Sequence, residues 1–234
     1  MNWDKVWTIN NWERLLFGDL FSKGQVGGLL LTLEIGILAI LLSTVFGAVL
    51  GVMRHSRNPL AWVPAMLYIQ TLRNIPLLIL IFWAFFVPPY FGWETSQFTS
   101  VLIALTLFTA AYIAEILRGG IRAIPEGDIQ AARALGLGRL QIQLWVILPQ
   151  AFYNMIPAIS GRYIVSIKNT SLAFLIGLAD LTEVGMQIGN RLMTSPVEVY
   201  MTLLMLYFIV NRTISYLTRL LENKSRFNRL FMRV

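Results

Sequence analysis

Five long apolar runs dominate this sequence, and they restrict the chain to folds whose surface faces lipid. A bilayer core about 30 Å thick needs about 20 mostly apolar residues per helical span, so each run is close to one crossing. Of the 234 residues, 56% are hydrophobic and only 13% are charged. We therefore predict an all-α integral membrane protein with about five transmembrane helices. The runs are Gly27–Met53, Ala61–Val87, Ser100–Leu117, Ala151–Ile167 and Val199–Leu217.

The basic residues predict on which side each loop lies, because Lys and Arg are enriched in cytoplasmic loops. They gather after the first, third and fifth runs, for example at Arg54, Arg57, Arg118 and Arg122, while the alternate segments carry most of the acidic residues. An N-terminus outside and a C-terminus inside satisfy every loop. We therefore attribute the net charge of +7 to membrane topology, which places basic residues in cytoplasmic loops, rather than to nucleic-acid binding.

Composition divides the chain into three parts. Residues 1–24 contain Trp3, Trp7 and Trp12 and are expected to lie at the outer interface, where tryptophan rings are favoured. Residues 25–220 form a single transmembrane domain, whose first span is expected to act as its own insertion signal. Residues 221–234 form a basic cytoplasmic tail that we expect to contact anionic lipid.

A hydrophilic segment over residues 119–150 separates the third and fourth runs and is long for a connection between packed helices. Pro125, followed by two acidic residues, predicts a helix start, and Gly136 predicts its end. Leu140–Leu148 is expected to form a second short helix that Pro149 closes. The segment is thus predicted to form a compact helical projection on the cytoplasmic side.

The sequence of this segment resembles a known family, the permease subunits of bacterial ABC importers for polar amino acids. The stretch Glu126–Gly136, with Ile147-Leu148-Pro149 downstream, is similar to their cytoplasmic EAA loop. The motifs Leu72–Leu78, Ala111–Gly120 and Ser166–Leu181 resemble further signatures of that family, in the same order. Two departures are Gln130, where the family usually has glutamate, and Asn169, where it often has aspartate.

The resemblance implies a type I ABC importer permease in the inner membrane, with an EAA loop whose coupling helix docks on a separate ATPase. It implies two ATPase subunits that bind ATP and magnesium, a second permease subunit that is identical or a sister chain, and a solute-binding protein. The cargo would be a polar amino acid. The family covers both acidic and basic kinds, and the positive lean of the charges inside the predicted spans favours glutamate, glutamine or aspartate over arginine or lysine. The implied coupling residues are Gln130, Ala131, Ala132, Leu135 and Gly136.

Charged residues inside the predicted spans are candidates for the substrate pathway, because an ion in lipid is expensive. They are Arg73, Glu115, Arg162, Lys168 and Arg212. From the helical rise, a direct pair between Arg73 and Glu115 requires the second span to enter late, for instance after Pro64. Asn74, beside Arg73, joins the predicted pathway.

The polar stretch Lys168-Asn169-Thr170-Ser171 ends the fourth apolar run and precedes another apolar segment. A helix break at this position would expose backbone N–H groups that, with Lys168, could hold a substrate carboxylate. The alternative is that the ammonium group of Lys168 extends to the outer interface. Both interpretations remain open at the level of sequence.

The sequence supports two other classes of function less well. A self-contained secondary transporter usually shows an internal repeat, which is not evident here. An intramembrane enzyme lacks obvious chemistry, because His55 is the single histidine and the chain has no cysteine. The chain also has no phosphate-binding loop of the G-x-x-x-x-G-K-[ST] type, so we predict a subunit that is not an enzyme, carries no cofactor or metal of its own, and depends on a partner for ATP hydrolysis.

Overall fold

A computed structural model describes residues 3–56, 58–193 and 196–231, with side chains up to residue 220. Arg57 and the basic side chains of residues 221–234, on which the predicted lipid-binding tail depends, lie outside this description. Four helical stretches of the described chain are long and apolar enough to cross a membrane. They are α4 (Gly28–His55), α7 (Gln97–Arg122), the continuous stretch Arg139–Ile176, and the first 25 residues of α12 (Pro196–Phe231).

The second apolar run forms two helices instead of one. Helix α5 (Pro59–Asn74) and helix α6 (Leu77–Phe86) meet at a bend of 104°. Ile75 is extended, with φ −93° and ψ 132°, because the ring of Pro76 disfavours helical geometry at the preceding residue. If this bent pair is one broken span, the described chain has five candidate crossings, as predicted.

The remaining elements of the described chain comprise an N-terminal group and several others. The N-terminal ones are α1 (Trp3–Val6), α2 (Ile9–Phe17), β1 (Gly18–Asp19), α3 (Leu20–Lys23) and β2 (Gln25–Val26), with β1 and β2 paired antiparallel. The others are the 3₁₀ helix η1 (Pro88–Phe91), α8 (Glu126–Ala134), α9 (Arg139–Gln141), the π-helix η2 (Ile142–Ile147), α10 (Leu148–Asn169), the 3₁₀ helix η3 (Thr170–Ile176) and α11 (Leu181–Leu192).

Helices α4 and α7 form the central contact of the fold. An added Cβ at Gly47 of α4 would lie 2.8 Å from the Cβ of Ile113 on α7, and one at Gly51 would lie 2.8 Å from Leu117 Cδ1. Only a residue without a side chain permits this approach. The largest buried apolar cluster lies beside it and includes Ile35, Ile81 and Leu105.

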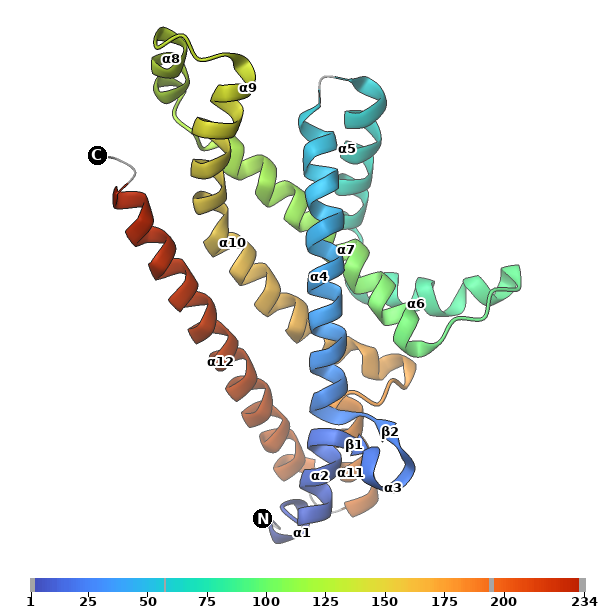
Figure 1. Ribbon diagram of the computed structural model, residues 1–234. Coiled ribbons are helices and arrows are strands. Elements are labelled where there is room, and N and C mark those ends of the chain that lie inside the picture. The colour runs from blue at the N-terminus through green and yellow to red at the C-terminus, as the bar shows by residue number, and fades with distance from the viewer. Residues whose placement is uncertain (1–2, 57, 194–195, 232–234) are drawn as a thin grey trace.

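The elements divide between two opposite ends (Figure 1). Helices α8 and α9 project at one end, where α4 ends and α5 begins. The N-terminal elements and α11 cluster at the other end, where Val6 and Leu15 pack with Leu181 and Val184. The two predicted functional regions, a projection and a polar pathway, can therefore be located relative to these ends.

Candidate functional site: a projecting helix and a line of arginines

Helix α8 is the projection that the sequence predicts. It begins after Pro125 and ends where Gly136 takes φ +78°, in the left-handed region that favours glycine. Ala132 is buried with only 5% exposure, and Ile129 packs against the cluster formed by Ile124, Ala151 and Met155. One side of α8 is thus fixed to the body of the protein.

The other side of α8 is open. Gln130, Ala131, Leu135 and Gly136 are exposed, and Leu135 reaches 82% exposure. Of the five predicted coupling residues, the structure therefore brings four to the surface and gives Ala132 a packing position instead. An exposed leucine beside small residues on a projecting helix provides a surface for close contact with another protein.

The sequence predicts a second short helix over Leu140–Leu148 that ends at Pro149, and this C-terminal limit is wrong. Helix α9 passes into the π-helix η2 and then directly into α10, which continues beyond Pro149 to Asn169. Pro149 lies in the first turn of α10, where a missing N–H is tolerated, and the widened π-turn precedes it. Helix α9 is thus continuous with the fourth span, and α8, which a turn separates from α9, packs against the same continuous helix through Ile129.

Arg73 and Glu115 form the ion pair that the sequence left open, with 3.7 Å between Nη1 and Oε1. The expected condition, a late entry of the second span, is wrong, because α5 starts at Pro59. The pair forms because α5 packs against α7, where Ile69 contacts the cluster of Ala110 and Ala114, so that Arg73 lies beside Glu115. Glu115 also accepts a hydrogen bond from Arg118 Nε at 2.9 Å.

A cavity of about 300 Å³ extends from this ion pair and has a strongly positive lining. The lining comprises Arg54, Met66, Ile69, Gln70, Arg73, Glu115, Arg118 and Arg122. Sequence reasoning assigned Arg54, Arg118 and Arg122 to topology and missed their shared cavity. The clustering of basic residues at the ends of the first and third runs was the available signal.

The predicted break at Lys168–Ser171 is a tightening of the helix rather than an opening. α10 continues directly into the 3₁₀ helix η3, and Thr170 and Ser171 donate their hydroxyl hydrogens to the carbonyl oxygens of Ile167 and Lys168. Free backbone N–H groups at this position were therefore a wrong expectation. Lys168 is exposed, whereas Thr170 is buried and Asn169 and Ser171 are half-buried.

Arg162 of α10 was named by the sequence only as an intramembrane charge, and the structure gives it an unusual environment. Its guanidinium carbon lies 3.8 Å from the ring centroid of Tyr112 and 5.0 Å from that of Phe108. Its Nε and Nη2 are buried and have no hydrogen-bond partner among the described residues. Cation–π contacts of about 2 kcal/mol offset only part of such desolvation.

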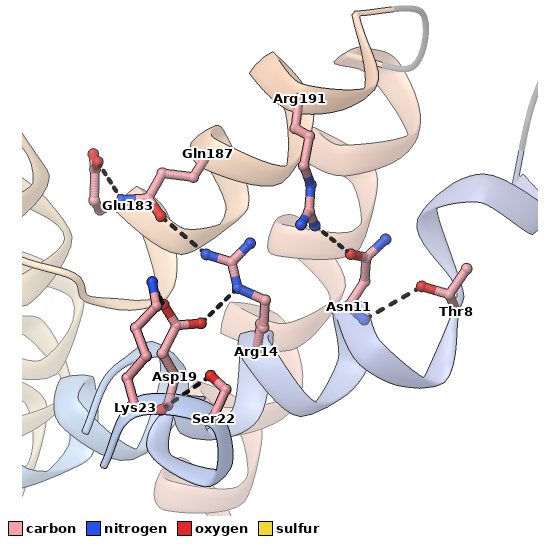
Figure 2. Close-up of polar contacts among 9 residues, drawn as sticks. All are labelled: Thr8, Asn11, Arg14, Asp19, Ser22, Lys23, Glu183, Gln187 and Arg191. Carbon is pink, nitrogen blue, oxygen red and sulfur yellow. Dashed lines mark hydrogen bonds and ion pairs between the residues drawn. The ribbon is translucent and has the colours of Figure 1, made fainter. Parts of the chain in front are cut away.

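A polar network joins the N-terminal segment to α11 at the end opposite α8 (Figure 2). Arg14 contacts Asp19 Oδ1 at 2.9 Å and Gln187 Oε1 at 3.3 Å, while Lys23 reaches Asp19 Oδ2 at 3.2 Å. Hydrogen bonds from Lys23 and Arg14, together with their charges, hold the pKa of Asp19 below its usual value. Arg191 donates to Asn11 Oδ1 at 2.8 Å.

Comparison with known proteins gives consistent matches over most of the chain. The family model described as "Binding-protein-dependent transport system inner membrane component" matches residues 29–227. The "Probable glutamine ABC transporter permease protein GlnP" of Bacillus subtilis is 34% identical over 197 residues, covering 83% of this chain and 90% of that protein. The "Glutamate/aspartate import permease protein GltK" of Escherichia coli is 34% identical over 207 residues, covering 85% and 92%.

A solved structure shares both fold and sequence with the chain. The protein in "Crystal structure of an amino acid ABC transporter with histidines" superposes with a TM-score of 0.80 at 32% identity, covering 84% of this chain and 92% of that one. The fold, the motifs and the family match therefore agree. The chain belongs to the inner membrane components of binding-protein-dependent transport systems, as an ABC transporter permease.

Proposed function

We propose that this permease subunit moves polar amino acids across the bacterial inner membrane. The observation that carries the proposal is the 34% identity, over more than four-fifths of the chain, to permeases named for glutamine and for glutamate and aspartate. The arginine-rich cavity beside Glu115 supports an anionic or zwitterionic cargo. The predicted pathway residues Arg73 and Asn74 lie at the end of α5, where the broken span turns.

The exposed side of α8 is the proposed docking surface for a separate ATPase subunit. Its exposed residues project from the end of the molecule, and its buried side is fixed to the helix that continues into the fourth span. Hydrolysis would occur in that partner, which binds ATP and magnesium. Gln130 lies on the exposed side, so its uncharged side chain would contribute a weaker contact than the glutamate that the family usually carries.

The remaining proposed partners are a second permease subunit and a solute-binding protein. A binding protein would meet the end opposite α8, where the Arg14–Asp19 network stabilises the N-terminal segment. The helical stretch Arg139–Ile176, which contains α10, would face the second permease. Only 17% of its most apolar part is buried within this chain.

Paired leucine substitutions test the docking surface. Leu135, directly after α8, is 82% exposed and Leu60 on α5 is 84% exposed, at the same end of the molecule. Leu135→Glu should abolish co-purification of the ATPase subunit, whereas Leu60→Glu should leave it intact. Ala131→Glu, which adds charge to the same side of α8, should reproduce the loss.

Transport by the assembled complex tests the rest of the proposal. Uptake of radiolabelled glutamine or glutamate should require ATP and should compete with other polar amino acids. Transport by this chain alone, without an ATPase, would identify a secondary transporter and overturn the proposal. Unchanged ATPase binding by both Leu135→Glu and Ala131→Glu would overturn the assignment of α8.

A further inference from the structure

The inference concerns Arg162, a half-buried residue whose Nε and Nη2 are buried and lack hydrogen-bond partners in the described chain. Buried polar groups are nearly always hydrogen-bonded, so each exception needs an explanation. For an arginine the group stays charged, because the guanidinium does not lose its proton under physiological conditions. An anion that arrives during the transport cycle would supply both the missing charge and the missing acceptors.

Tyr112 connects Arg162 to the arginine-rich cavity. The guanidinium of Arg162 lies 3.8 Å from the ring centroid of Tyr112, and that of Arg73 lies 5.4 Å from the same centroid. Arg73 in turn lines the cavity with Arg54, Arg118 and Arg122. A positively charged line thus extends from within α10, past one aromatic ring, to the cavity between α5 and the end of α7.

Arg162 and the described cavity lining together contain five arginines and one carboxylate, so this line favours a ligand with net negative charge. Among the described residues that line the cavity, Glu115 is the one carboxylate, and it pairs with Arg73 and Arg118. A neutral zwitterion would bring an ammonium group as well as a carboxylate and leave the charge of Arg162 uncompensated. An amino acid with a carboxylate side chain has a net charge of −1 and would compensate it.

We propose that Arg162 is the specificity-determining residue of the pathway and binds the side-chain carboxylate of an acidic amino acid. The inference rests on the proposed function, since it assumes an amino acid cargo. In the state described here the guanidinium rests on Tyr112 and Phe108. On binding, it would leave the rings and present two parallel N–H groups to the two carboxylate oxygens, and Arg73 would form the next cationic position toward the cavity.

Binding by the purified permease–ATPase complex, without the solute-binding protein, tests this assignment directly. Radiolabelled glutamate should bind the wild-type complex more tightly than glutamine. Arg162→Gln should weaken glutamate binding by about tenfold to a hundredfold, the range expected for loss of hydrogen bonds to a charged group, with a much smaller effect on glutamine. The affinity of Arg162→Lys for glutamate should lie between those of the wild type and Arg162→Gln, because lysine keeps the positive charge but lacks the planar pair of N–H groups.

Arg219→Gln is the matched control, since it removes an arginine from an exposed position near the end of the α12 span and is not one of the predicted pathway residues. It should leave the ratio of glutamate to glutamine binding unchanged. Co-purification of the ATPase should be the same in all variants, which excludes a folding defect. An equal loss of glutamate and glutamine binding in Arg162→Gln would overturn the proposed selectivity, and so would an unchanged ratio.

The two proposals fail in distinguishable ways. If the wild-type complex transports no amino acid, the proposed function itself is wrong. If it transports amino acids and Arg162→Gln keeps the wild-type preference, the proposed function stands and only the role of Arg162 is lost.

Discussion

Asp180 is a buried carboxyl group at the start of α11, at the end of the molecule opposite α8. It is 1% exposed, its Oδ1 accepts a hydrogen bond from the Glu183 N–H at 2.9 Å, and the Tyr207 hydroxyl lies 3.4 Å from Oδ2. Burial outweighs these hydrogen bonds and raises the pKa of Asp180 to about 7. One residue therefore combines a helix cap with a titration near neutral pH.

Stability should depend on pH through this residue. Because the folded pKa is about 7 and the ordinary value is 3.8, the folded state binds more protons between these values, so stability falls as pH rises through this window. The free energy of unfolding should drop by about 2 to 3 kcal/mol between pH 5 and pH 8. Thermal unfolding of the detergent-solubilised protein at both pH values measures the effect.

Asp180→Asn separates the cap from the titration. The amide oxygen of asparagine can still accept the hydrogen bond from the Glu183 N–H, so the helix cap is retained. The variant should show a flatter dependence of the melting temperature on pH than the wild type. Equal slopes in the two proteins would show that another group titrates in this range.

The α4–α7 pair is the element on which the fold depends most. Gly47 and Gly51 lie one turn apart on α4 and face Ile113 and Leu117 of α7, which are also one turn apart. The two helices therefore approach through a groove of small residues, as is typical of membrane helices. Such an interface is sensitive to single methyl groups.

Matched glycine substitutions test this interface. Gly47→Ala would place a Cβ 2.8 Å from Ile113 Cβ and 2.9 Å from the carbonyl oxygen of Ala110, so the helices must separate, at a cost of about 1 to 3 kcal/mol. Gly161→Ala on α10 meets nothing within 4 Å and should be neutral or stabilising by up to about 1 kcal/mol. Melting temperatures in detergent compare the two variants, and equal values would contradict the packing argument.

At the scale of the whole molecule, the two ends have different chemistry. One end carries exposed α8 and the cavity rich in arginine, and the other carries the N-terminal elements and α11 with their mixed-charge network. The positive-inside tendency predicts that the α8 end is cytoplasmic. The proposed function requires this separation, since the proposed ATPase and solute-binding protein would meet the chain on opposite sides.

Single cysteines can test the predicted orientation, because the chain contains no cysteine of its own. Ser22 in α3 is exposed at one end, and Gly127 in α8 is exposed at the other with open space around it. In intact spheroplasts an impermeant maleimide should label Ser22→Cys but not Gly127→Cys, and inside-out vesicles should reverse the pattern. The opposite result would invert the proposed topology.

Local features of this protein followed from its sequence because they depend on neighbouring residues. Apolar run length predicted the spans, and Pro125 and Gly136 predicted the limits of α8, since proline and glycine act through their own backbone geometry. Tertiary structure alone decided the contacts that join distant residues. The contact between Arg73 and Glu115, the position of Arg162 on Tyr112, and the burial of Ala132 all depend on how helices tilt, bend and cross. A linear pattern does not encode the angles between helices, because the packing of many side chains sets them together.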